Sequence, residues 1–248
     1  MTSAALDLGV VGHGGFEVEF RTADGGRARG SLAMCWSDLL NRGGLPVRSF
    51  PSYRGQRNCS GWWWLSHTGT HVGYESWLER DNLMVLDADP DVVSVVSQPF
   101  WLHWFDADRP KRHAPDFLVR HRDGTVAVID VRADDRVEVD DVAVFAMTGR
   151  ACESVGWGYR RVGTVDPVLA ANLRWLSGYR HPRNRSDSAA ANLMAAFRCG
   201  RPLLEGCCEV GDPIEVLPTL FHLLWTGSLV VDLLTLPLDA WTSVRSGP

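Results

Sequence analysis

Lysine is almost absent from this chain of 248 residues: Lys111 is the only one, and arginine supplies the other side-chain positive charges. The chain also lacks C-x-x-C pairs among its six cysteines, and no basic-then-apolar signal segment opens it. These absences favour reduced thiols over a disulfide framework, so we expect a cytoplasmic protein. A zinc site built from three of the cysteines is an alternative that the spacing leaves open: Cys199, Cys207 and Cys208.

Long apolar runs, internal repeats and low-complexity tracts are lacking as well. The most apolar stretch, 216–241, is interrupted by Pro218, Gly227, Asp232 and Pro237, which argues against a membrane span. With 45% apolar and 22% charged residues, the composition is that of a globular protein with a sizeable core. The length permits one large domain or two modest ones.

Charge is unevenly distributed along the sequence. The net charge of −5 does not favour a free-standing nucleic-acid binder, but basic residues gather in 42–57, 109–122 and 160–185. Residues 203–240, in contrast, carry six acidic residues and no lysine or arginine. A molecule with one basic side could bind a phosphate backbone, whereas ordinary solvated surface charge is the alternative for each basic stretch.

Hydrophobic periodicity predicts a mixed α/β domain followed by a mainly helical one. We expect strands at 16–20, 62–65, 92–96, 100–105 and 159–165, and helices at 74–86 and 137–152. The strand at 62–65 should be buried, 31–41 fits a strand or a helix, and 42–61 reads as mostly loop. Asp166-Pro167 marks the boundary between domains 1–165 and 166–248. In the second, helices at 168–176, 189–198 and 217–225 and a hairpin over 229–244 indicate a winged-helix-like module.

A predicted hairpin over residues 113–132, HAPDFLVRHRDGTVAVIDVR, is the most informative part of the sequence. If 122–124 form a three-residue loop with a left-handed glycine, His121 pairs with Thr125. Continuing that ladder places Asp116 opposite Asp130, where like charges destabilise a sheet unless something compensates them. Two converging carboxylates with a nearby cation therefore predict a divalent-metal site rather than core packing.

The pieces Pro115-Asp116 and Asp130-Val131-Arg132, with an upstream helical glutamate, resemble the PD-(D/E)xK nuclease signature. A longer run, SHTGTHVGYESWLERDNLMVLDADPDVVSVVSQPFWL followed by the hairpin, resembles the TnsA-like endonuclease subunit of heteromeric transposases. The similarity covers roughly 45–165 and, more weakly, the tail. It implies a restriction-endonuclease-like mixed sheet flanked by helices.

The resemblance also implies a catalytic set. Asp116 and Asp130 match the two strand acids, and Glu79, nineteen residues before Gln98 of the Ser-Gln-Pro segment, matches the helical glutamate. Glu75, one turn from Glu79, is the second choice, and Gln98 is a possible accessory residue. The implied cofactor is Mg²⁺, for which Mn²⁺ is a possible substitute, held by these carboxylates and the carbonyl of Val131.

The implied activity is cleavage of the 5′ ends of a mobile element. The expected partners are double-stranded DNA at the transposon ends, a DDE-type transposase subunit and an AAA+ ATPase regulator. A restriction or junction-resolving nuclease of the same fold is the nearest alternative.

The chain departs from the family pattern at Arg132, which occupies the position of the motif lysine. Arginine keeps its charge and can clamp a phosphate, but it cannot lose a proton as a buried lysine can. This departure leaves two further readings open: a structural ion pair between Arg132 and Asp130, and a non-catalytic scaffold that only binds DNA or partners.

Overall fold

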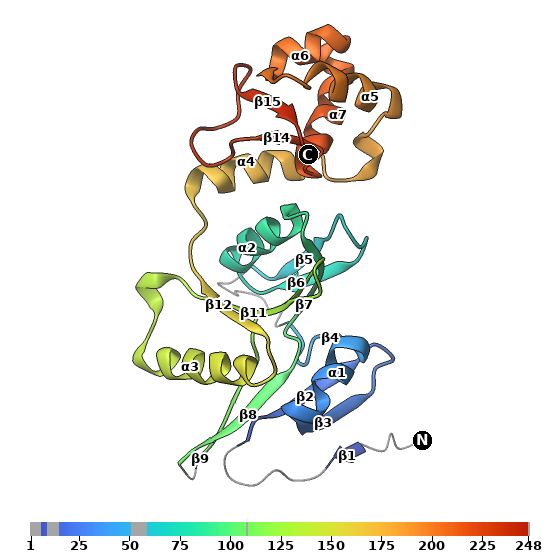
Figure 1. The fold of residues 1–248 in the computed structure, drawn as a ribbon. Coiled ribbons are helices and arrows are strands. Elements are labelled where there is room, and N and C mark those ends of the chain that lie inside the picture. Colours follow the sequence, from blue (N-terminus) through green and yellow to red (C-terminus); the bar gives the residue numbers. More distant parts are fainter. Residues whose placement is uncertain (1–5, 9–14, 51–58, 108, 248) are drawn as a thin grey trace. The chain divides into compact units, whose positions relative to one another are not determined.

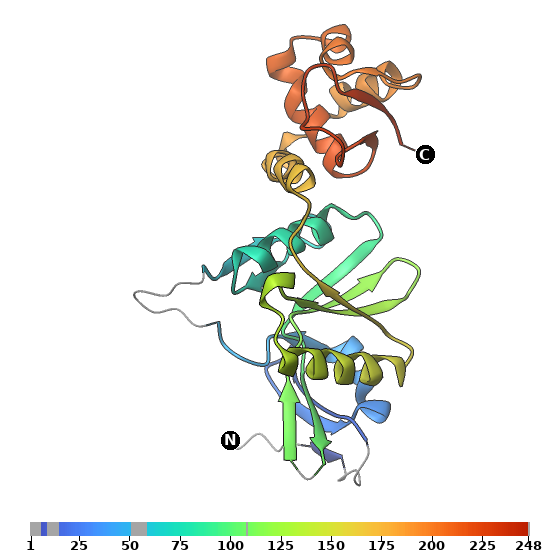
Figure 2. The ribbon, with the colours of Figure 1, turned by 90° about the vertical axis from the view of Figure 1, so that its left-hand side faces the viewer.

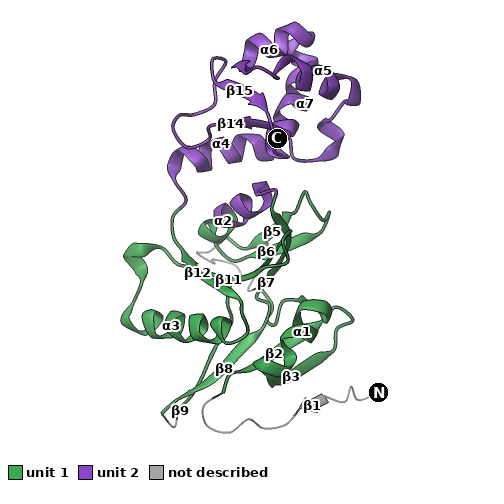
Figure 3. Ribbon diagram, viewed as in Figure 1, with its two compact units in different colours: residues 1–80, 91–164 green, residues 81–90, 165–248 purple. Residues whose placement is uncertain are grey.

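The structure is a computed structural model that describes residues 6–8, 15–50, 59–107 and 109–247. The chain divides into two compact units, residues 1–80 with 91–164 (unit 1) and residues 81–90 with 165–248 (unit 2) (Figure 3). Unit 2 therefore includes the end of a helix that begins in unit 1. Among the described residues, no helix combines the length and apolar character needed to cross a membrane.

A four-stranded sheet with two helices forms the part of unit 1 that carries the expected motif (Figure 1). In chain order, its elements are α2 (Trp77–Ala88), β7 (Val92–Ser97), β10 (Phe117–His121), β11 (Val126–Val131), α3 (Val139–Glu153) and β12 (Gly158–Val162). Two strands of another sheet lie between β7 and β10 in the sequence. The sheet order is β12-β11-β10-β7, with β12 parallel to β11 and the other pairs antiparallel. A short 3-10 turn, Asp134–Arg136, precedes α3. This mixed α/β arrangement confirms the predicted class.

A second sheet of unit 1 has the order β1-β3-β2-β8-β9, with β4 paired to β2. Its strands are β1 (Leu6–Leu8), β2 (Glu17–Thr22), β3 (Arg27–Ser31), β4 (Gly43–Leu45), β8 (Trp101–Asp106) and β9 (Arg109–His113), and α1 (Leu32–Arg42) follows β3. Figure 2 shows the long β8–β9 hairpin. Strand β9 was not predicted because RPKRH carries no apolar alternation.

Both sheets of unit 1 contribute to one hydrophobic core. Its buried members come from β2, α1, β8, β10, β11 and α3, and include Phe20, Leu39, Leu102, Val128 and Cys152. α3 packs on β11 and β12 (Figures 1 and 2). Burial of these side chains from both sheets fixes the hairpin's position, because apolar area removed from water is the main stabilising term.

Several expected boundaries in unit 1 are wrong. The segment 31–41, which fitted a strand or a helix, is helical from Leu32, and Ser31 ends β3. The expected loop over 42–61 contains β4, and residues 51–58 of it lie outside the described residues. The expected strand at 62–65 is β5 (Gly61–Trp64), paired with β6 (His71–Tyr74), but Trp62 is 60% exposed rather than buried. Tyr74 ends β6, so the helix begins later, at Trp77.

Unit 2 contains four helices and a small sheet among its described residues. They are α4 (Pro167–Ser177), α5 (Asp187–Ala196), β13 (Arg201–Pro202), α6 (Leu203–Val210), α7 (Pro213–Trp225), β14 (Leu229–Val231) and β15 (Ser243–Ser246). The antiparallel sheet order is β13-β15-β14. Helix α6 was not predicted, and the two hairpin strands are shorter than expected. Asp166 and Asp212 cap α4 and α7, each followed by a proline that suits the first helical position.

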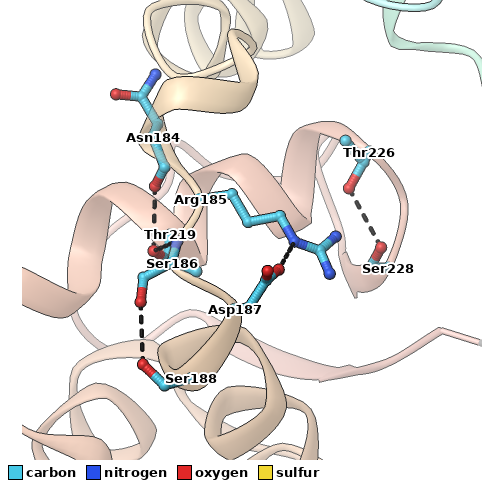
Figure 4. Close-up of polar contacts among 8 residues, drawn as sticks. All are labelled: Asn184, Arg185, Ser186, Asp187, Ser188, Thr219, Thr226 and Ser228. Carbon is cyan, nitrogen blue, oxygen red and sulfur yellow. Dashed lines mark hydrogen bonds and ion pairs between the residues drawn. The ribbon is translucent and has the colours of Figure 1, made fainter.

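The loop between α4 and α5 is tied to α7 by one buried threonine. Thr219 is 1% exposed, and its Oγ1 accepts a hydrogen bond from Ser186 N while donating to Asn184 O, both at 3.0 Å (Figure 4). The 3-10 turn Pro182–Asn184 lies in this loop. Thr219 thus satisfies two backbone groups of the loop at once.

Replacing Thr219 with valine should destabilise the protein by about 1–3 kcal/mol, because a nearly isosteric side chain leaves a donor and an acceptor without partners. Thermal unfolding of the full chain measures the effect. Thr226→Val is the matched control: Thr226 lies at the partly exposed end of α7, where its hydroxyl contacts Leu223 O and Ser228 Oγ (Figure 4). Equal losses in the two variants would contradict the role assigned to Thr219.

Candidate active site

The hairpin has the predicted register. His121 N donates to Thr125 O over 2.9 Å, and Gly124 closes the turn at a φ of 86°, in the left-handed region that glycine tolerates best. Phe117 pairs with Ile129 in the ladder between β10 and β11. One step further along that ladder, Asp116 faces Asp130, which confirms the expected opposition of the two residues.

Asp130 is almost fully buried, at 2% exposure, and the protein satisfies both of its oxygens. Oδ1 lies 2.8 Å from His113 Nε2, and Oδ2 accepts a hydrogen bond from the Tyr159 hydroxyl at 2.8 Å. Burial and then the charge of Asp130 raise the pKa of Tyr159 and raise that of Cys152 to about 12. These two groups therefore stay protonated at neutral pH, and the Tyr159 hydroxyl remains a donor to the carboxylate.

Asp116 directly precedes β10, and the pKa of its carboxyl group is strongly raised. Its Oδ2 accepts a hydrogen bond from Val131 N at 2.7 Å. The residue stays partly accessible, but protein atoms surround the carboxylate, and this burial is the main reason its pKa rises well above the usual value. The negative charges of Glu79 and then Asp130 raise the pKa further, against smaller opposing effects of the Val131 amide and Arg48.

Glu79 lies in the first turn of α2, in a capping arrangement. Glu79 N donates to Ser76 Oγ at 3.1 Å, while Ser76 Oγ and Glu75 N donate to the two carboxylate oxygens of Glu79 at 2.9 and 2.8 Å. Burial is the main cause of its raised pKa. The glutamate thus stabilises the helix start and also faces the two aspartates closely enough for its charge to act on Asp116.

Glu75 lies before α2, so the expectation that it shares a helix face with Glu79 is wrong; Tyr74 still belongs to a strand, and the helix starts only at Trp77. Glu75 Oε2 instead pairs with Arg48 Nη2 at 2.6 Å, and Glu75 Oε1 is buried without a hydrogen-bond partner. This contact anchors Arg48 beside the acids.

Arg132 does not pair with Asp130. Its Nε donates to Arg136 O and Asp141 Oδ2, both at 3.1 Å, and its Nη2 lies 3.1 Å from the same Asp141 oxygen. That oxygen also accepts a hydrogen bond from Glu138 N at the start of α3. The ion pair considered between Arg132 and Asp130 is therefore not the one formed: Arg132 pairs with Asp141 in the first turn of α3.

Gln98 supports the site through its backbone. Its N–H donates to Asp116 O at 2.8 Å, and its carbonyl accepts from Val47 N at 2.9 Å. The residue has a φ of 44°, which is unusual for a residue with a side chain. Its side chain is 2% exposed, and Oε1 has no hydrogen-bond partner. Gln98 therefore positions the start of β10, a role that its sequence context did not reveal.

A pocket of about 350 Å³ brings most of the expected residues together. It is lined by Arg48, Glu79, Trp101, Arg112, His113, Ala114, Asp116, Asp130, Val131, Arg132, Asp141 and Phe145. The Arg112 guanidinium stacks over the Trp101 ring, 4.4 Å from its centroid. Acids and arginines line the same pocket, which suits an anionic ligand that binds through a cation.

The donor chemistry of the pocket fits a divalent ion, because three carboxylates repel one another there. Nevertheless, within the described ranges no three histidine, cysteine, aspartate or glutamate side chains form a metal-holding group. Asp130 and Glu79 direct their oxygens to protein partners instead. The zinc alternative receives no support either, since Cys199 and Cys208 are exposed while Cys207 is buried.

Sequence reasoning missed two residues that hold Asp130: His113 and Tyr159. They come from β9 and β12, and no motif spacing links them to an aspartate on β11. Ser76 was detectable in principle, since Ser76-x-x-Glu79 is a capping-box pattern. No protein-family model matches the chain, and a search of curated proteins gives no match.

Asp116→Asn should raise the unfolding temperature at pH 8 in the absence of divalent ions. The folded-state pKa of Asp116 is raised, so its favourable contribution is present below its ordinary pKa and is lost as the pH rises through the raised value. The gain from Asp116→Asn should therefore shrink in acid, as followed by thermal melting across pH.

Asp123→Asn is the control from the same hairpin. Hydrogen bonds from Thr125 lower the pKa of Asp123, so its stabilising contribution is present above its ordinary pKa and is lost as the pH falls through the lowered value. Asp123→Asn should therefore not raise the unfolding temperature at pH 8. An Asp116→Asn variant that melts like the wild type at every pH would contradict the repulsion among the pocket acids.

Proposed function

We propose that this chain is a metal-dependent DNA endonuclease of the PD-(D/E)xK class. Within that class, we propose that it is the TnsA-like subunit of a heteromeric transposition system, cutting the 5′ ends of a mobile element. The observation that carries the proposal is the convergence of Glu79, Asp116 and Asp130 on one pocket that arginines also line.

The fold supports this proposal. The expected order of helix, strands, hairpin, helix and strand corresponds to α2, β7 and β8, the β10–β11 hairpin, α3 and β12, although β8 belongs to the second sheet. We propose that this part of unit 1 is restriction-endonuclease-like. Unit 2 has the order helix, strand, two helices and a hairpin from α5 to β15, and we propose a winged-helix-like fold for it.

Asp116, Asp130 and Glu79, with the Val131 carbonyl, would hold Mg²⁺ or Mn²⁺. A bound ion of this kind polarises a scissile phosphate and lowers the pKa of an attacking water. His113 and Tyr159 orient the Asp130 carboxylate, and the Val131 amide orients that of Asp116. Glu79 has to leave part of its capping arrangement to contribute an oxygen, and Ser76 remains able to cap α2.

We propose that Arg48, rather than Arg132, supplies the positive charge on the scissile phosphate. Arg132 is engaged by Asp141 and Arg136 at the start of α3. Arg48 lines the pocket, is held by Glu75, and lowers the pKa of both Asp116 and Glu79 through its charge. A guanidinium placed this way can hydrogen-bond a phosphate oxygen and stabilise charge that develops there.

The proposed partners rest on the family resemblance: double-stranded DNA at the transposon ends, a DDE-type transposase and an AAA+ ATPase. A restriction or junction-resolving nuclease would use the same pocket. A catalytically inactive scaffold is the second candidate, and the observation that favours it is the engagement of Arg132, Asp130 and Glu79 with protein partners.

The purified protein, with its partner subunits where required, should nick DNA carrying the element's ends when Mg²⁺ or Mn²⁺ is added. Asp116→Ala should abolish nicking because it removes one of the three carboxylates that would hold the ion. Gel electrophoresis of end-labelled DNA measures the cut, and Asp123→Ala serves as the exposed hairpin control.

Wild-type activity no greater than that of Asp116→Ala in every partner combination would refute the nuclease proposal. Nicking that appears only in Arg132→Lys would support the scaffold instead.

Glu79→Gln separates capping from catalysis within the same test. Glutamine also suits the capping position, so thermal stability should change little, whereas loss of the carboxylate should abolish nicking. A stable, fully active Glu79→Gln variant would leave Glu79 with a capping role only.

Arg48→Ala should reduce the nicking rate by about 10²-fold or more, the effect typical of removing one preorganised donor to a developing oxyanion. Arg132→Ala should reduce it by less than about tenfold, because its main contacts are structural. Single-turnover rates at saturating protein measure both, with melting temperatures as the folding check. The reverse order of effects would assign the phosphate contact to Arg132.

A further inference from the structure

Unit 2 carries an apolar groove that shares no lining residue with the proposed nuclease pocket. It has a volume of about 240 Å³ and receives residues from α4, α6, α7 and the loop after β14. Its lining consists of Trp175, Leu203, Leu204, Leu217, Phe221, Leu238, Asp239 and Ala240. Asp239 is the single charged member.

Backbone contacts hold the walls of this groove in place. The buried side chain of Asn172, on α4, donates to Leu233 O and Leu236 O at 2.9 and 3.0 Å and accepts from Leu238 N at 2.8 Å. Leu204 N, at the start of α6, donates to Ala240 O at 3.0 Å. The loop between β14 and β15 is thereby fixed against two helices.

An aromatic cluster supports the groove from α4 and α7. The rings of Trp175 and Phe221 meet edge to face with centroids 5.9 Å apart, and Tyr179 packs on Phe221 at 4.8 Å. Trp175 is nevertheless 58% exposed, and Leu204 is 39% exposed. Leu234, Leu236 and Trp241 of the neighbouring loop are 61–80% exposed. Apolar exposure of this extent around a groove is typical of a protein-binding site.

Most charges next to the groove-lining residues in the sequence are negative, and the nearby arginines Arg174 and Arg201 pair with Asp81 and Glu209. Residues 203–240 contain six acidic residues and no lysine or arginine. Glu205 follows Leu204 on α6, Glu215 precedes Leu217 on α7, and Asp239 lines the groove itself. Hydrogen bonds from the Thr242 side chain and the Trp241 amide lower the pKa of Asp239, so its charge persists at neutral pH. This surface attracts cationic groups and repels a phosphate backbone.

The elements that read DNA in winged-helix proteins are unsuited to that task here. The recognition helix of such folds places polar and basic side chains in the major groove. At the equivalent place in the chain order, α7 exposes Ile214 and Glu215 near its start and carries no lysine or arginine. The following loop is held by Asn172 and α6 rather than projecting as a wing.

We propose that this groove docks a segment of a partner protein, an amphipathic peptide whose apolar side chains enter the groove and whose flanking lysines or arginines meet the surrounding acids. Apolar burial supplies most of the affinity, and the acidic surround selects a basic partner and speeds its association. The proposal does not depend on the nuclease activity of unit 1.

A library of random peptides about 16 residues long, roughly four helical turns, displayed on phage provides the probe. It is selected on the full-length protein and, in parallel, on the Leu204→Asn/Leu217→Asn variant. Peptides enriched on the wild type should carry apolar residues at helical spacing and more lysine and arginine than acid. A synthetic representative should bind the double variant at least about tenfold more weakly in fluorescence anisotropy, because two anchoring contacts become polar.

Ile214→Asn is the matched control, because Ile214 is 83% exposed on α7 but does not line the groove. The Ile214→Asn variant should bind the peptide with the affinity of the wild type. Glu205→Lys should weaken binding without altering the groove, and this variant keeps the test valid if the double variant unfolds. Enriched peptides that are neutral or acidic, or that bind all variants equally, would overturn the proposal. So would a short duplex DNA whose binding is lost in the double variant while no peptide is enriched.

Discussion

The antiparallel pairing of β10 with β11 is the constraint on which the candidate site depends. It sets Asp116 opposite Asp130, and the start of α2 adds Glu79 to the same pocket. Burial of the carboxylate first, and then the negative charges of Glu79 and Asp130, raise the pKa of Asp116 well above its usual value. Such an arrangement persists only because the surrounding core holds the strands and helix in place, and it is most stable when positive charge is supplied.

Hydrogen bonds and one nearby arginine of the protein stabilise these carboxylates. Asp130 is held by His113 and Tyr159, Glu79 by the start of its helix, and Arg48 contributes a positive charge. These contacts orient the acids and also occupy their oxygens, so a nuclease and a scaffold share the same starting geometry. What separates them is whether a divalent ion can compete for these oxygens. Burial is the first cause of the raised pKa values of Glu79 and Asp116, and neighbouring acids add to it.

The two units differ in the sign of the charge they present at their proposed binding sites. In unit 1, Arg48 and Arg112 line the same pocket as the acids, which suits a phosphate backbone. In unit 2, Asp239 lines an apolar groove, and residues 203–240 contain six acids and no lysine or arginine. Under the functions proposed, one unit acts on DNA and the other recruits protein. The net charge of −5 belongs to the whole chain and predicts the local charge of neither site.

The sequence by itself determined the hairpin, its register and the opposition of Asp116 and Asp130, because a three-residue turn with glycine and alternating strand directions are local properties. It also indicated the helices after Asp166, though not α6, and the acidic stretch near the chain's end. Only the tertiary structure decided the partners of the motif residues: Asp141 for Arg132, and His113 and Tyr159 for Asp130. Those choices depend on side chains that strands and helices distant in sequence bring within hydrogen-bonding distance, and no sequence spacing encodes that approach.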